Sequence, residues 1–279
     1  MKRFLALLLA VLMMTGCLFA VACKKPEDPE TPSNPEEPAP EAPKPRAFIA
    51  GYERLESKDG VAVSHSYRIL LNLNADGTMT TYVAHLSGDE HETAIYNGTY
   101  SFGANEENDE TITFTYTHAT AADPVTETIS DAVIIDGMFA VPFYLLDTQE
   151  YSAADVKFYE TDPITLEGDT YLGYLTKSSG MGNMVYAYLI TLKADKTFVI
   201  SIMQLAGATM HIVGTAEGTY STDGANAIFT YDVPDGEGGI AKEDHAVTVT
   251  DFSATTFSAG FNIAQAGVLA SPAPFIKLK

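Results

Sequence analysis

The sequence predicts an all-β protein, built as two tandem antiparallel meanders of eight strands each after a segment that does not fold. Two observations lead to this prediction. The stretch YRILLNLNADGT, Tyr67–Thr78, returns as YAYLITLKADKT, Tyr186–Thr197. Apolar and polar side chains alternate in both copies, which is the two-residue period of a half-buried strand, and no segment between the expected strands has the 3.6-residue period of a helix. The chain is therefore expected to contain one β-fold twice.

The two copies share a detailed pattern. Each has one apolar face that begins with tyrosine: Tyr67, Ile69, Leu71 and Leu73 in the first, Tyr186, Tyr188, Ile190 and Leu192 in the second. A single leucine interrupts the opposite face of each copy, Leu70 in the first and Leu189 in the second. Asp76-Gly77 is a strong hairpin turn because glycine accepts positive φ, and Asp195-Lys196 is a weaker version of it. These aspartates are expected to be turn residues.

Turn residues divide the chain into candidate strands. The first copy has eight: Ala50–Leu55, Tyr67–Asn74, Met79–Ser87, Thr93–Phe102, Thr111–Thr117, Val125–Ile135, Met138–Leu146 and Asp155–Glu160. The second copy has eight more: Tyr171–Thr176, Tyr186–Lys193, Thr197–Ala206, Met210–Ser221, Ala227–Val233, His245–Phe252, Thr255–Ile263 and Pro274–Leu278.

Short local matches support the repeat. They pair Gly51-Tyr52 with Gly173-Tyr174, Gly98-Thr99-Tyr100 with Gly218-Thr219-Tyr220, Phe114-Thr115-Tyr116 with Phe229-Thr230-Tyr231, and Phe158 with Phe275. We expect a boundary near Asp162–Thr165. Closing each meander into a barrel would remove its sheet edges, and a small barrel is either packed with side chains or holds one small ligand.

The early Gly-aromatic element, the L-x-A-D-x-T turn and the G-T-Y strand together resemble the lipocalin-like domains of secreted bacterial lipoproteins. The resemblance covers most of residues 47–279 and implies two lipocalin-like β-barrels, residues 47–162 and 163–279. A pair of immunoglobulin-like sandwiches is the alternative fold.

The first residues have the pattern of an export signal. Lys2 and Arg3 precede the apolar run Phe4–Met14, which is too short to span a bilayer comfortably. The small residues before Cys23 resemble the lipobox of bacterial lipoproteins, so residues 1–22 are expected to be a signal peptide and Cys23 the lipidated residue. Cys17 is the alternative lipidation site, and ordinary signal cleavage is the alternative to lipidation. The resemblance implies an exported protein, lipid-anchored to the bacterial membrane, with its domains on the extracytoplasmic side.

Residues 23–46 carry a proline at nearly every third position with acidic residues between them. Such sequence stays extended, at about 3.1 Å per residue, so this linker could hold a domain up to roughly 70 Å from the lipid. Docking of a PxxP motif to a partner is the alternative role. Because Lys24 does not resemble the aspartate that retains lipoproteins in an inner membrane, we expect the outer membrane in a cell that has two.

The charge of the chain excludes some partners. Acidic residues number 37 against 16 basic ones, for a formal net charge of −21. Nucleic acid is therefore not an expected partner, because binding a polyanion requires Lys and Arg. The same charge favours a soluble monomer.

The sequence indicates no catalytic, metal or cofactor site. The six histidines lack the spacing of a zinc site, and repeat alignment places His85 opposite Gln204 and His91 opposite Met210: the set is His65, His85, His91, His118, His211 and His245. The acidic run Asn105–Glu110 is expected to be a solvated hairpin tip rather than a calcium loop. No nucleophile elbow, phosphate loop or mature-chain catalytic cysteine is present.

These observations predict a non-catalytic, membrane-anchored surface protein that binds a small apolar ligand, or a protein of the envelope or host. A structural or adhesive display module with packed barrels is the alternative, and an enzyme is the third reading. If the barrels are hollow, the inward side chains line the cavity: Tyr67, Ile69, Leu71, Tyr100, Phe114, Tyr116, Tyr186, Tyr188, Ile190, Tyr220, Phe229 and Tyr231.

Overall fold

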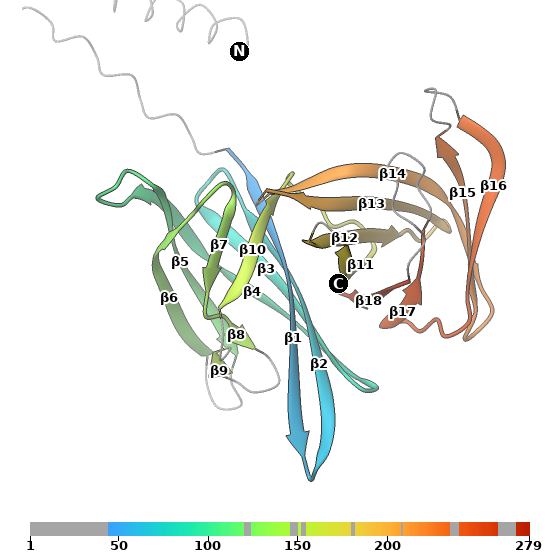
Figure 1. The fold of residues 1–279 in the computed structure, drawn as a ribbon, viewed down its shortest axis with the longest axis horizontal. Coiled ribbons are helices and arrows are strands. Elements are labelled where there is room, and N and C mark those ends of the chain that lie inside the picture. The colour runs from blue at the N-terminus through green and yellow to red at the C-terminus, as the bar shows by residue number, and fades with distance from the viewer. Residues whose placement is uncertain are drawn as a thin grey trace, which may run out of the picture. The chain divides into compact units, whose positions relative to one another are not determined.

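The computed structural model describes residues 44–119, 124–145, 150–151, 155–179, 182–207, 209–234, 240–261 and 272–279. These residues form an all-β fold without helices, as predicted (Figure 1). The expected signal peptide, both candidate lipidation sites (Cys23 and Cys17) and nearly all of the expected linker lie outside the described residues. Within the described ranges, no helix has the length and apolarity needed to cross a membrane.

The first half of the fold, called lobe 1, is an antiparallel meander. Its main strands are β1 (Arg46–Lys58), β2 (Val61–Leu73), β3 (Thr78–Ser87), β4 (Glu90–Ala104), β5 (Glu110–Ala119), β6 (Pro124–Val133), β7 (Met138–Val141) and β10 (Val156–Thr161). They are hydrogen-bonded in the order β7-β10-β1-β2-β3-β4-β5-β6. The strand that ends the copy thus returns to pair with the strand that begins it.

Lobe 2 repeats this arrangement. Its strands are β11 (Asp169–Ser179), β12 (Gly182–Leu192), β13 (Thr197–Ala206), β14 (Thr209–Thr222), β15 (Ala227–Pro234), β16 (Ile240–Val249), β17 (Thr256–Ala259) and β18 (Ala273–Lys277). Their order is β17-β18-β11-β12-β13-β14-β15-β16, which matches lobe 1 strand for strand. The expectation that both halves have the same strand order is confirmed.

One parallel bridge between Glu160 of β10 and Thr209 of β14 joins the lobes into a 16-stranded sheet. This sheet is not closed into a barrel. Among the described residues, no strand ladder joins β6 to β7 in lobe 1 or β16 to β17 in lobe 2. Each lobe therefore has one seam, at the same place in the repeat.

All sixteen expected strands appear, but several were predicted too long. The expected strand Thr255–Ile263 ends as β17 at Ala259, and His245–Phe252 ends as β16 at Val249. The expected strand Met138–Leu146 ends as β7 at Val141, because Pro142 follows and has no N–H to donate to the ladder. The last residues of this expected strand form a separate short strand, β8 (Tyr144–Leu145), which pairs in a small sheet with β9 (Glu150–Tyr151), a strand that was not predicted.

The duplicated turns have the same geometry in both lobes. The Asp76 Oδ1 atom accepts hydrogen bonds from the Thr78 amide at 3.0 Å and the Thr78 hydroxyl at 2.6 Å. Asp195 and Thr197 repeat these distances. The two bonds from Thr78 hold the pKa of the Asp76 carboxyl below its usual value. The aspartates are turn residues, as predicted.

Other repeated elements confirm the alignment. The Tyr100 hydroxyl donates to the Asn74 carbonyl at 2.6 Å, and the Tyr220 hydroxyl donates to the Lys193 carbonyl at 3.1 Å. The ring of Phe139 stacks on Phe158 at 4.9 Å in lobe 1, and the equivalent rings of lobe 2, Phe257 and Phe275, stack at 4.7 Å. Gly98 and Gly218 are also equivalent, since a Cβ atom at either would collide with a carbonyl of the next strand, Thr115 or Thr230.

One predicted match is wrong. Tyr52 pairs with Tyr67 across the β1–β2 hairpin, whereas Leu175 pairs with Tyr186 in lobe 2, so Tyr52 corresponds to Leu175. Gly51 is therefore equivalent to Tyr174 rather than to Gly173. A shift of one residue moves a side chain to the other face of a strand, which a match of two letters cannot detect.

The interrupting leucines belong to a third apolar core. Each lobe has its own inner core, and a separate cluster gathers side chains from the outer faces of both lobes. Leu70 is fully buried in this third core, and Leu189 packs against it. The third core consists of Ala47, Ile49, Leu70, Ala84, Leu172, Ala187, Met203, Met210, Ile276 and Leu278. Part of the outer face is thus apolar because the lobes pack on each other.

A buried arginine lies beside this third core. The Arg68 guanidinium is fully buried, donates to Glu53 Oε1 at 2.7 Å and to the Tyr67 carbonyl at 2.8 Å, and lies 5.7 Å from the centre of the Tyr174 ring. A Cβ atom on Gly51 would lie 2.5 Å from that same ring. Arg68 and Gly51 of lobe 1 therefore both contact the Tyr174 ring of lobe 2, and the missing side chain of Gly51 leaves the space that this ring occupies.

Candidate functional site

The twelve side chains predicted to line a cavity are buried or partly buried, and eleven of them belong to the two inner cores or pack against them. Lobe 1 contributes Ile69, Leu71, Tyr100, Phe114 and Tyr116, and lobe 2 contributes Tyr186, Tyr188, Ile190, Phe229 and Tyr231, with Tyr220 partly buried against them. Tyr67 is buried and stacks on His85. Their rings touch other core rings, such as Phe198 on Phe229 at 5.3 Å. A ligand contact for these residues stays a prediction.

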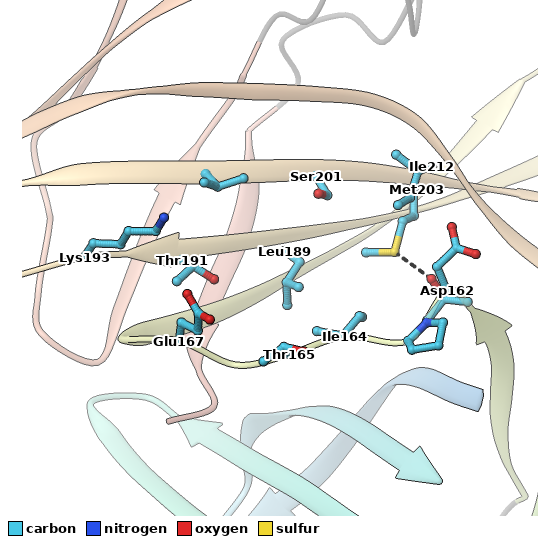
Figure 2. A pocket seen from close by; sticks show the side chains of 13 residues that line it. Asp162, Ile164, Thr165, Glu167, Leu189, Thr191, Lys193, Ser201, Met203 and Ile212 are labelled. Carbon is cyan, nitrogen blue, oxygen red and sulfur yellow. Dashed lines mark hydrogen bonds between the residues drawn. The ribbon is translucent and has the colours of Figure 1, made fainter. Parts of the chain in front are cut away.

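A groove of about 270 Å³ lies outside the inner cores, against lobe 2 (Figure 2). One wall is the segment 161–167 that leads from β10 to β11, and the other is made by side chains of β12, β13 and β14. The groove is lined by Thr161, Asp162, Pro163, Ile164, Thr165, Glu167, Leu189, Thr191, Lys193, Val199, Ser201, Met203 and Ile212. Figure 2 shows Lys193 and Glu167 at one end and Met203 and Ile212 at the other.

Two hydrogen bonds hold the connecting segment in place over this groove. The Asn72 side-chain amide donates to the Ile164 carbonyl at 3.0 Å. The Thr161 hydroxyl donates to the Met203 sulfur at 3.2 Å, which is the dashed line in Figure 2. The groove therefore has a wall anchored to both lobes.

The repeat explains why there is space. Leu70 faces Tyr82 across β2 and β3, whereas Leu189 faces Ser201 at the equivalent place in lobe 2. The small serine leaves room where lobe 1 has a tyrosine ring. Sequence reasoning missed this groove, because it treated Leu189 only as an exception and did not compare Ser201 with Tyr82.

A second pocket, of about 700 Å³, lies beside the β3–β4 turn of lobe 1 and is lined by residues of β1, β2, β3 and β4. It brings together His65 and His85, which are only 9% and 3% exposed. Their Nδ1 and Nε2 atoms are 3.0 Å apart, and Glu56 Oε2 lies 3.4 Å from the other nitrogen of His65. Asp89, Glu90 and Glu92 also line the pocket, so its charge is negative.

Sequence reasoning weighed each histidine alone and missed this pair. A signal was available, because the Asp76-Gly77 turn sets the β2–β3 register. Counting residues outward from this turn along both strands places Tyr67 opposite His85 and His65 opposite Ser87. His65 and His85 are therefore diagonal neighbours on the same face of the sheet.

The other histidines do not join this pair. His91 Nε2 lies 3.0 Å from the Lys277 carbonyl oxygen, His118 is buried in lobe 1, and His211 is exposed. The His245 side chain lies outside the described residues. In the described part of the chain, no three or more His, Cys, Asp or Glu side chains are grouped to hold a metal ion. Asn105–Glu110 is an exposed turn, closed by Asn105 Oδ1 accepting from the amides of Glu107 and Asp109.

A polar cluster inside lobe 1 has no counterpart among the described residues of lobe 2. The Tyr96 hydroxyl and both ring nitrogens of His118 are buried without a hydrogen-bond partner among the described residues. His118 stacks on Tyr144, with ring centres 3.5 Å apart, and its Nε2 is 3.7 Å from Glu127 Oε1. Burial raises the pKa of the Tyr96 phenol. By ladder register, the residue of lobe 2 equivalent to Tyr96 is Ala216.

Comparison of the chain with protein families, with curated proteins and with solved structures finds no match. The resemblance to lipocalin-like lipoprotein domains therefore stays a prediction from the sequence.

We predict that Tyr96→Phe stabilises the protein. Removing a buried hydroxyl that lacks a partner saves its desolvation cost, so the free energy of unfolding should rise by about 1 kcal/mol. Tyr100→Phe is the matched control, because its hydroxyl is bonded to the Asn74 carbonyl and its loss should cost about 1 kcal/mol. Urea unfolding followed by tyrosine fluorescence measures both. Equal destabilisation by the two changes would contradict the prediction and mean that Tyr96 has a bound partner.

Proposed function

We propose that this chain is a lipid-anchored, non-catalytic binding protein of the bacterial cell surface, which holds a small apolar ligand in the groove against lobe 2. The observation that carries the proposal is the groove itself, an anchored wall over Leu189, Val199, Met203 and Ile212. Ligand pockets are mainly apolar with a few polar groups that orient the ligand. Lys193 and Glu167 supply such groups at one end.

The groove sets a limit on the ligand. At about 270 Å³ it lies just below the ~300 Å³ at which drug-sized pockets begin, so the ligand is small. A ligand with one polar end would place that end at Lys193 or Glu167 and its apolar part over Met203. Among the described residues that line the groove, no nucleophile lies within hydrogen-bond distance of a base held by a third group, which favours binding over catalysis.

The packed inner cores favour a second candidate, a structural or adhesive display module. Aromatic rings fill both cores, as in the contacts of Phe139 with Phe158 and of Phe257 with Phe275. A packed lobe can still present its loops to a protein of the envelope or host, because rigid scaffolds often carry function on loops.

The proposal includes closure of each lobe into an eight-stranded lipocalin-like barrel. The identical strand order of the lobes and their equivalent seams support it, since closure removes exposed edges. If the lobes close, the β6 and β7 amides that face the seam should exchange with D2O as slowly as those of central strand β3. Exchange within seconds at the seam, with slow exchange in β3, would show open lobes.

Lipid anchoring can be tested at the two cysteines. We expect Cys23→Ser to abolish labelling by radioactive palmitate in the producing cell and to release the protein from membranes. Cys17→Ser is the control and should leave both unchanged. The opposite pattern would move the anchor to Cys17, and labelling of neither residue in the unaltered protein would rule out a lipoprotein.

The groove can be tested by filling it. Native mass spectrometry of the full protein from its source should show one small apolar molecule bound. Ser201→Tyr should remove that molecule, and it is tolerable to the fold because Tyr82 occupies the equivalent place in lobe 1. Thr117→Tyr, at an exposed strand position outside the groove, should retain it. A protein without a bound molecule, or Ser201→Tyr that retains it, would refute binding in the groove.

A further inference from the structure

We propose that the pocket of His65 and His85 binds one divalent transition-metal ion, such as Zn²⁺ or Cu²⁺. This site lies in lobe 1 and is independent of the groove against lobe 2. Neither histidine lines the groove, and no groove residue lines the pocket.

The first support is the distance between the two nitrogens. His65 Nδ1 and His85 Nε2 are 3.0 Å apart, and the ring planes differ by only 6°. Two imidazole nitrogens on one tetrahedral ion, each with a bond of about 2.0–2.1 Å, lie about 3.3 Å from each other. The nitrogen–nitrogen distance of a ligand pair is therefore only a few tenths of an ångström longer than the one observed, and the two rings must also turn so that both lone pairs point at the ion.

The second support is the carboxylate behind His65. Glu56 Oε2 lies 3.4 Å from His65 Nε2, so the proton of His65 belongs on Nε2 and the Nδ1 lone pair faces His85. Histidines that bind metals commonly direct the other ring nitrogen to a carboxylate, which fixes the tautomer. Glu56 also lies 3.4 Å from Arg54, which helps to hold its position. To bind the ion, His85 must carry its own proton on Nδ1.

The pocket suits a cation and leaves room around it. Its acidic residues are Glu56, Asp89, Glu90 and Glu92, and no lysine or arginine lines it. Imidazole ligands select Zn²⁺, Cu²⁺ or Ni²⁺ over Ca²⁺ and Mg²⁺, which prefer oxygen. With two protein nitrogens, water completes the coordination shell. The site is therefore open rather than a closed structural centre.

The third support comes from the repeat. The lobe 2 residues equivalent to His65 and His85 are Met184 and Gln204. Lobe 2 builds the same hairpin without either histidine, so the fold does not require them. Tyr67, which stacks on His85 at 4.7 Å, is equivalent to Tyr186 and is common to both lobes.

The test is calorimetric titration with Zn²⁺ of the protein purified from its source, in detergent, after any free cysteine thiol is blocked with iodoacetamide. We expect one ion per chain. Replacing each histidine by its lobe 2 equivalent, His65→Met and His85→Gln, should weaken binding at least 30-fold. Glu56→Gln should weaken it about 10-fold, the loss expected when a carboxylate behind a ligand is removed.

A second measurement does not depend on the variants. In the unaltered protein, Zn²⁺ should shift the imidazole ¹⁵N resonances of His65 and His85 and leave those of His211 in place. No stoichiometric binding, or shifts confined to other groups, would overturn the proposal. Unchanged affinity in the folded double variant would assign the ion to the carboxylates and would also overturn it.

Discussion

The register between paired strands is the constraint on which the rest of this structure depends. An aspartate that accepts two hydrogen bonds from the threonine two residues later closes the turn after β2 and again after β12. Each turn determines which residues face each other along the next ladder. Because side chains alternate between faces, that choice decides the members of the inner cores, the third core and every pocket.

The two lobes use their outer faces differently. Leu70 of lobe 1 is fully buried in the third core, while Leu189 of lobe 2 packs at its edge and also lines the groove. The leucine that interrupts the polar face in both copies therefore packs between the lobes in lobe 1 and lines a candidate binding surface in lobe 2. Arg68 and Gly51, which contact the Tyr174 ring, also occur in lobe 1 only. The equivalent residues of lobe 2 are Ala187 and Tyr174.

The candidate sites occur where the copies differ. Ser201 leaves the groove open where lobe 1 has Tyr82, and the histidine pair occupies positions that hold Met184 and Gln204 in lobe 2. A duplicated fold supplies its own comparison, because residues common to both lobes are explained by the shared meander. Residues present in one lobe only need a separate reason, and a binding site is one such reason.

The sequence by itself determined the all-β class, the duplication, the sixteen strands and the inward faces, because each depends on local periodicity and turn chemistry. The short sequence matches did not align Gly51 with its equivalent residue in lobe 2, Tyr174. They also did not show that β7 ends at Val141 within an apolar run, although Pro142 indicates that end. Only the tertiary structure decided that Leu70 is buried between lobes, that segment 161–167 walls a groove and that His65 meets His85. These features join residues distant in the chain, and their contacts follow from ladder register and lobe packing, which no single stretch of sequence encodes.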